Sequence, residues 1–144
     1  MSYAYLCPAE LDRHLQDSPN VGVEQWLGHY ERVDLPGFRF IRWLRLVRES
    51  DQRHADEWCV YEKNHLDMGS EKFVNMDEFE EVGDPDEPEG KRSVFPSLQE
   101  ALHFASSLGA VDGKYVKVHQ IPFIYREFIL SEGKPSKGIN EWFS

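Results

Sequence analysis

Apolar residues recur with helical spacing near the start of the chain. In CPAELDRHLQ, Leu11 and Leu15 lie four residues apart and follow Pro8, which suits a first helical turn, so we predict a helix there. Residues 23–33, VEQWLGHYERV, show the same periodicity. They predict a second short helix, with an apolar face formed by Val23, Trp26, Leu27 and Tyr30.

The stretch 36–50, PGFRFIRWLRLVRES, fits either a helix or a strand. As a strand it has one face with Phe38, Phe40, Leu44 and Leu46, a second with Ile41, Trp43 and Val47, and two arginines on each. Dense aromatic and β-branched residues and the preceding Pro-Gly favour the strand. A second strand-like run at 57–65 follows a polar loop at 50–56, which predicts a hairpin.

The second half of the chain has one clear helix signal. Ser97 and Glu100 form a capping box, and Gly109 closes an apolar face of Leu98, Ala101, Leu102, Ala105 and Leu108. Residues 71–82 fit a helix or a short strand with a turn, and 83–93 predict a loop. Residues 114–130 are rich in β-formers, with Pro122 expected at a sheet edge or a bend.

These elements predict an α+β fold, with an antiparallel sheet and helices packed on one face. A chain of 144 residues is long enough for one domain with its own core, which we expect to span residues 1–144. Within it we expect a mobile acidic loop near 83–93 and a flexible C-terminal tail at 131–144, because both are poor in apolar residues.

Negative charge is concentrated in residues 71–90, which hold nine acidic residues and one lysine. That is −8 of the formal charge of −10, and the other 124 residues hold 17 acidic and 15 basic residues. Such a patch could meet a basic partner. The predicted partner-binding residues are Asp77, Glu78, Glu80, Glu81, Asp84, Asp86, Glu87, Glu89 and, as an aromatic anchor near the C-terminus, Trp142.

Four of the nine arginines lie in the stretch 36–50, at positions 39, 42, 45 and 48. Residues 37–43, GFRFIRW, resemble the central strand of the RNA-recognition motif, which implies stacking of single-stranded RNA on the aromatic side chains. Pro36 and Arg39 depart from that pattern. We instead expect a two-faced strand whose arginines lie over apolar neighbours and pair with carboxylates, some of them from the acidic segment, and we do not expect nucleic-acid binding.

Candidate residues for metal binding and catalysis are few. His54, Cys59 and His65 are zinc-type ligands, but Cys59 and His65 lie about 20 Å apart on a straight strand, so we predict no metal and no cofactor. No motif for a nucleophilic serine, phosphate binding or a zinc protease is present. His103 and His119 could line a cleft.

The sequence therefore predicts a protein-binding module of the inhibitor or immunity type. The alternative is a small-molecule-binding protein or enzyme with a cleft lined by Trp, Tyr and His, and we lean against an enzyme. With two cysteines, no secretory pattern and no apolar run of membrane-spanning length, we expect a cytoplasmic protein without membrane contact.

Overall fold

The computed structural model describes residues 3–51, 56–69, 82 and 90–142. In chain order the elements are α1 (Pro8–Asp17), β1 (Val23–Glu31), β2 (Arg39–Glu49), β3 (Glu57–Leu66), β4 (Lys91–Phe95), α2 (Leu98–Ser107), β5 (Val116–Lys117), α3 (Ile121–Glu132) and α4 (Ile139–Trp142). None of the helices in these residues is long and apolar enough to cross a membrane.

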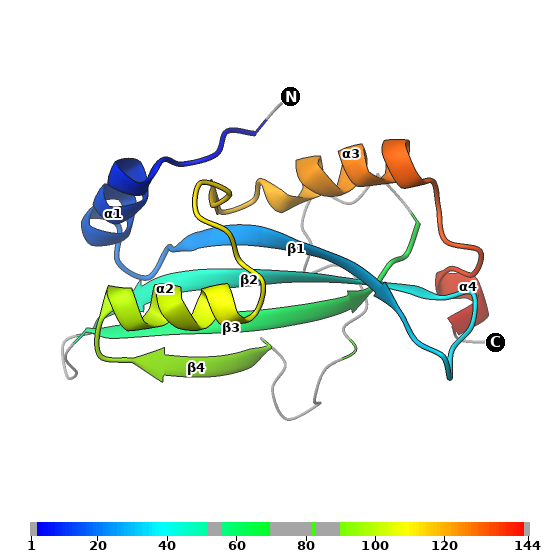
Figure 1. Cartoon of the computed structure of the whole chain (residues 1–144), viewed down its shortest axis with the longest axis horizontal. Helices are drawn as coiled ribbons and strands as arrows, with labels where there is room; N and C mark the ends of the chain where they lie inside the picture. Colours follow the sequence, from blue (N-terminus) through cyan, green and yellow to red (C-terminus); the bar gives the residue numbers. More distant parts are fainter. Residues whose placement is uncertain (1–2, 52–55, 70–81, 83–89, 143–144) are drawn as a thin grey trace.

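The strands form one antiparallel sheet in the order β4-β3-β2-β1-β5 (Figure 1). β2 is central and pairs with β3 along its length, from Phe40 opposite Leu66 to Glu49 opposite Glu57. The predicted strand at 38–48 and its hairpin with 57–65 are therefore confirmed. The single α+β domain with an antiparallel sheet is confirmed as well.

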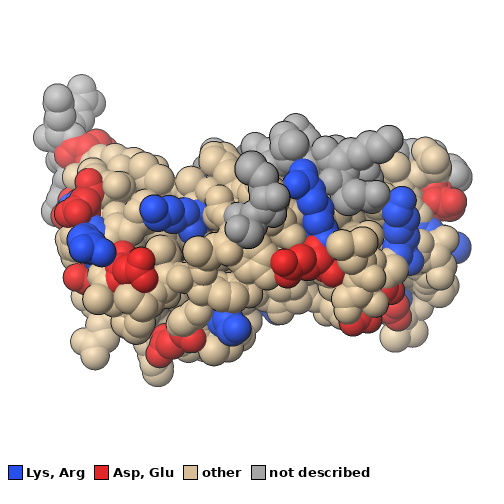
Figure 2. All heavy atoms as spheres, turned by 90° about the horizontal axis from the view of Figure 1, so that it is seen from above, with Lys and Arg blue, Asp and Glu red and all other residues tan. Residues whose placement is uncertain are grey.

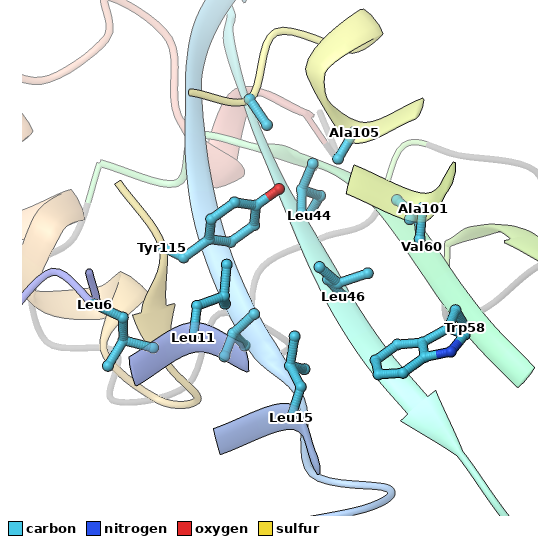
Figure 3. Close-up of a cluster of buried hydrophobic side chains, with 12 residues drawn as sticks. Leu6, Leu11, Leu15, Leu44, Leu46, Trp58, Val60, Ala101, Ala105 and Tyr115 are labelled. Carbon is cyan, nitrogen blue, oxygen red and sulfur yellow. The ribbon is translucent and has the colours of Figure 1, made fainter. Parts of the chain in front are cut away.

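Both faces of β2 are apolar, and helices cover both. Leu44 and Leu46 point to the face that we call the α1/α2 face, where they pack with residues of these two helices (Figure 3). Ile41 and Trp43 point to the opposite face, which we call the α3 face because they pack with that helix. The helices thus extend beyond the one face that we expected, because alternate residues of a strand point to opposite sides and both sets here need cover.

The helices predicted near the start of the chain and after Ser97 are confirmed. α1 carries Pro8 in its first turn and buries Leu11 and Leu15. α2 begins after Ser97, whose hydroxyl accepts the Glu100 backbone N–H at 3.2 Å. Its fully buried residues are alanines, which let the helix approach the sheet closely, whereas its leucines are only partly buried.

The helix predicted at 23–33 is wrong, because residues 23–31 form β1. A β-bulge lies between Trp26 and Gly28, so the pairing with β2 skips Leu27. The extra residue shifts the alternation of side chains by one position. Val23 and Tyr30 therefore point to the same face although they are seven residues apart, and this spacing imitates a helix.

The strand-rich reading of 114–130 is also wrong for most of its length. Only Val116 and Lys117 pair with β1, and α3 begins at Ile121. Pro122 lies in the first turn of this helix, where its missing N–H costs nothing, rather than at a sheet edge or bend. The buried side chains recur with helical spacing at Ile121, Ile124, Tyr125 and Ile129.

The C-terminal half of the predicted acidic loop is partly a strand. Residues 91–93 belong to β4, because they pair with β3 opposite Val60 to Glu62. Gly90 precedes them with a φ of +93°, and a Cβ there would lie 2.5 Å from the Glu62 carbonyl oxygen, so only glycine fits. Residues 83–89, and residues 71–81 with their open helix-or-strand prediction, lie outside the described residues.

Trp142 packs against the domain. Its ring lies edge-on to Phe38 and Phe40, with ring centroids 5.4 and 6.1 Å apart, in a cluster that also includes Leu66. The predicted tail 131–144 thus contains the end of α3 and the short helix α4. These contacts give Trp142 a structural role and leave less of its ring for a partner.

Candidate functional site

Each arginine of the β2 run forms an ion pair with a carboxylate, as we predicted. The pairs are Arg39–Asp67 at 2.7 Å, Arg42–Glu62 at 3.0 Å, Arg45–Glu24 at 2.8 Å and Arg48–Asp56 at 2.8 Å. None of these four carboxylates belongs to the acidic segment 71–90, whose own acidic residues lie outside the described residues. The four positive charges are therefore matched within the sheet and the segments next to it.

The Arg39–Asp67 pair is the most buried of the four. The side chain of Asp67 is inaccessible to solvent, and that of Arg39 is 9% exposed. Tyr125 donates a second hydrogen bond to the Asp67 carboxylate at 2.5 Å, and Arg39 also donates to the Gly133 carbonyl at 2.7 Å. The guanidinium lies over the Phe128 ring, 4.5 Å from its centroid. This cluster joins β2 and α3, so it is part of the fold rather than a ligand site.

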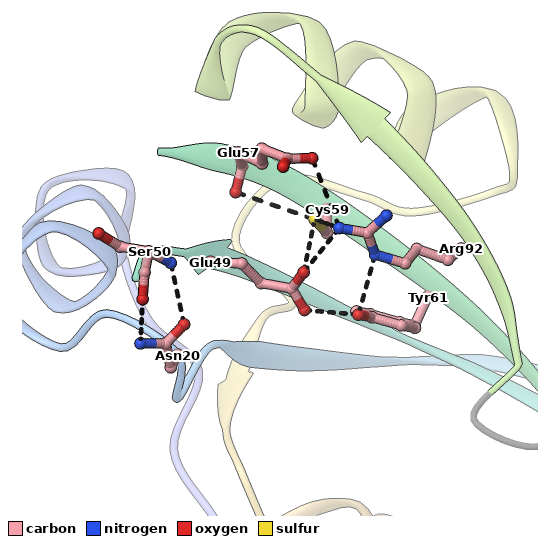
Figure 4. Close-up of polar contacts among 7 residues, drawn as sticks. All are labelled: Asn20, Glu49, Ser50, Glu57, Cys59, Tyr61 and Arg92. Carbon is pink, nitrogen blue, oxygen red and sulfur yellow. Dashed lines mark hydrogen bonds and ion pairs between the residues drawn. The ribbon is translucent and has the colours of Figure 1, made fainter. Parts of the chain in front are cut away.

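A second polar cluster lies on the α3 face near the ends of β2 and β3 (Figure 4). The Glu49 carboxylate accepts hydrogen bonds from the Tyr61 hydroxyl at 2.5 Å, the Arg92 guanidinium at 2.8 Å and the Cys59 thiol at 3.2 Å. Arg92 also lies 3.5 Å from Glu57 and donates to the Tyr61 oxygen at 3.2 Å. One glutamate of β2 thus binds side chains from both β3 and β4.

This environment sets the protonation states of the cluster. Burial acts to raise the pKa of Glu49, but the donors Tyr61, Arg92 and Cys59 outweigh it and lower the pKa below its usual value. Burial and the nearby Glu49 raise the pKa of Cys59 to about 12 and that of Tyr61 to about 12. At neutral pH Cys59 is therefore a protonated thiol, a poor nucleophile and a poor metal ligand.

A small polar recess lies beside this cluster. It has a volume of about 200 Å³ and is lined by Asn20, Val21, Arg45, Val47, Glu49, Tyr61 and Lys63. Arg45 is held by Glu24, whose pKa is raised by burial despite the guanidinium next to it. The recess is open to solvent and does not combine an apolar wall with convergent polar groups.

A larger groove lies between α2 and the outermost strand, β4. Its volume is about 590 Å³, and it is lined by Phe95, Gln99, Glu100, His103, Phe104 and Ser107. Phe95 and Phe104 form its apolar base, with ring centroids 5.0 Å apart. His103 thus lines a groove, which is one of the roles that we considered for it from the sequence. His119 does not line this groove; its backbone N–H donates to Glu24 at 3.1 Å, and it has a φ of +69°.

The residues considered for metal or RNA binding have structural surroundings. Within the described residues no three His, Cys, Asp or Glu side chains could hold one metal ion. His54 lies outside these residues, and His65 is buried and stacks on Trp43 at a centroid distance of 6.0 Å. Phe38, Phe40 and Trp43 are at most 8% exposed, so they offer no stacking surface for RNA.

Eight of the nine predicted partner-binding residues lie outside the described residues: Asp77, Glu78, Glu80, Glu81, Asp84, Asp86, Glu87 and Glu89. The sequence reasoning missed the groove beside β4, because residues 91–93 of this strand were assigned to a loop and no strand was predicted there. The pair Phe95 and Phe104, nine residues apart across a predicted cap, could have indicated it. Comparison with known protein families, with curated proteins and with solved structures finds no match to this chain.

Proposed function

We propose that this protein acts by binding another protein that presents a basic surface, and that the acidic segment 71–90 supplies the attraction. The observation that carries the proposal is the distribution of charge along the chain. The segment has a net charge of −8, while the remaining residues are nearly balanced. Within the described residues the β2 arginines pair with carboxylates outside the segment, which supports the proposal.

The described surface fits this division of charge. On the face drawn in Figure 2, acidic and basic side chains are interspersed rather than gathered by sign. A balanced surface gives little long-range field, so the segment dominates the field that a basic protein meets on approach. Inhibitors and immunity proteins use such complementarity to speed association with a basic active surface and to cover it.

The test compares two variants with equal loss of charge. The first, Asp77→Asn/Glu78→Gln/Glu80→Gln/Glu81→Gln, neutralises four acids of the segment. The second, the control, neutralises four exposed acids elsewhere: Asp12→Asn/Glu31→Gln/Asp112→Asn/Glu132→Gln. Proteins captured from host lysate are identified, and each candidate is purified and titrated against the wild type and both variants at 50 and 300 mM salt.

We expect a basic protein that binds the wild type stoichiometrically and binds the segment variant at least about tenfold more weakly, with a shallower dependence on salt. The control variant should keep most of the affinity. Equal affinities for the two variants, or a partner whose binding is insensitive to salt, would contradict the proposal. A third variant, which neutralises Asp84, Asp86, Glu87 and Glu89, then measures how much the second half of the segment contributes to the affinity.

The alternative of a small-molecule site has less support. The recess at Tyr61 is small and polar, and the groove at His103 is wide open and contains no Trp or Tyr. For location we propose a reducing compartment such as the cytoplasm, because Cys7 and Cys59 are both free thiols.

A further inference from the structure

Among the described strands, none pairs with the outer edge of β4. β4 is the last strand of the sheet, and no strand lies beyond it in the described part of the chain (Figure 1). An edge strand presents backbone N–H and C=O groups that can pair with an extended segment of another protein. The opposite edge strand, β5, is only two residues long and offers much less backbone.

The side chains of β4 do little to prevent another strand from pairing with this edge. Charged side chains at an edge usually discourage pairing. The Arg92 guanidinium, however, is held over the α3 face by Glu49 and Tyr61, at 2.8 and 3.2 Å, and does not extend past the edge. Val94 is 43% exposed and apolar. Of the charged residues of β4, this leaves Lys91, which forms no ion pair with another described residue.

The groove between β4 and α2 lies directly beside this edge. Phe95 is opposite Trp58, a residue of the core beneath α2, so its ring is on the α1/α2 face. There Phe95 and Phe104 form an apolar base open to solvent. In strand addition the backbone pairs with the edge, and alternate side chains of the added strand enter such pockets.

We infer that the basic partner docks as an extended segment that pairs with the outer edge of β4 and places one apolar side chain in this groove. The inference rests on the proposed function and names the form of the partner. A basic segment is compatible with the groove, because the exposed Glu100 lines it and can meet a basic side chain there. β4 also follows the acidic segment directly in the sequence, after Gly90.

The probe is the fluorescently labelled peptide KVKFKVK, in which basic and apolar residues alternate. Fluorescence anisotropy measures its affinity at low salt, and amide chemical shifts of the protein report where it binds. A second peptide with the same sequence and N-methyl groups on alternate backbone nitrogens keeps every charge and side chain. It should bind at least about tenfold more weakly, because it cannot form the strand hydrogen bonds.

Two lysines at opposite edges of the sheet provide a matched pair of variants. Lys91→Glu removes a positive charge at the β4 edge and should tighten binding of the peptide by about threefold or more. Lys117→Glu makes the same change in β5, and it should have a much smaller effect. Phe104→Ala should weaken binding, whereas Leu130→Ala, which trims an exposed leucine of α3, should not.

Three results would overturn the inference. If the peptide does not bind, β4 is not the docking edge. The same holds if the methylated peptide binds as tightly as the parent peptide and Lys117→Glu changes the affinity as much as Lys91→Glu does. If light scattering shows a dimer of the chain that Lys91→Glu alters, a second copy occupies the edge. These failures are distinct from failure of the proposed function, in which the acidic-segment variant would bind its basic partner as well as the control variant does.

Discussion

The buried pair of Arg39 and Asp67 allows a quantitative test of how this fold is held together. Asp67→Asn keeps the shape of the side chain and removes its charge. The buried Arg39 guanidinium is then left without a counter-ion. The new amide also places its NH2 group against a donor, either Arg39 at one oxygen position or Tyr125 and the Gly69 N–H at the other. Removing one member of a buried ion pair costs about 3–5 kcal/mol, so we expect a loss of stability of this size.

The exposed pair of Arg32 and Asp34 is the matched control. Arg32 and Asp34 share two hydrogen bonds, at 3.1 and 2.7 Å, whereas Arg39 and Asp67 share one at 2.7 Å. The side chains of the control pair are 45% and 64% exposed. Asp34→Asn should therefore cost at most about 1 kcal/mol, as is typical of exposed ion pairs. Both variants remove one carboxylate charge beside one arginine, so the comparison tests the combined effect of burial and of the additional donors to Asp67, Tyr125 and the Gly69 N–H.

Urea unfolding followed by tryptophan fluorescence measures both variants. With a slope of about 1–3 kcal/mol per M, the loss expected for Asp67→Asn lowers the midpoint by at least about 1 M. Adding Arg39→Met to this variant should recover part of the loss, because it removes the uncompensated charge. If Asp67→Asn and Asp34→Asn unfold within about 0.5 kcal/mol of each other, the buried pair does not hold β2 to α3 as we describe.

Three further predictions concern thiols, a helix cap and pH. At pH 8, Ellman's reagent should modify the exposed Cys7 quickly and Cys59 only on unfolding; fast modification of both in the folded state would contradict the raised pKa and burial of Cys59. Ser97→Ala should lower stability by about 1 kcal/mol in urea unfolding through loss of the cap, and Ser106→Ala, exposed on the same helix, by much less. Because the folded state lowers the pKa of Glu49, its carboxylate stabilises the fold above its unfolded pKa and this contribution is lost as the pH falls through the folded pKa. The gap in stability between the wild type and Glu49→Gln should thus be larger at pH 6 than at pH 3, and a constant gap would refute this.

The sequence was a good guide where local pattern and tertiary structure agree. The Ser97 cap and the aromatic and β-branched residues around Trp43 each favour one element, and the fold keeps it. The ion pairs of the β2 arginines were also predictable in kind, because a strand with two apolar faces has to place its charged ends against carboxylates.

The wrong predictions of secondary structure arose where a single residue decides whether an apolar pattern belongs to a helix or to a strand. The bulge at Leu27 gives an irregular strand the apolar spacing of a helix, and a bulge depends on a partner strand that the local sequence does not specify. Pro122 indicates a break within a strand or the first turn of a helix, and the packing of α3 on Trp43 decides between them. The cluster around Glu49 was not predictable, because it joins residues 43 positions apart through β4.

The order of the strands has a consequence for how the chain acquires its structure. β1, β2 and β3 follow one another and pair with their neighbours in sequence, so residues 23–66 can form a three-stranded meander soon after they are made. β5 pairs with β1, the first strand, and therefore closes the longest loop in the sheet. We expect the meander to form first and β5 and α3 to attach last. During synthesis the apolar α3 face of β2 is therefore exposed to solvent for longer than the α1/α2 face.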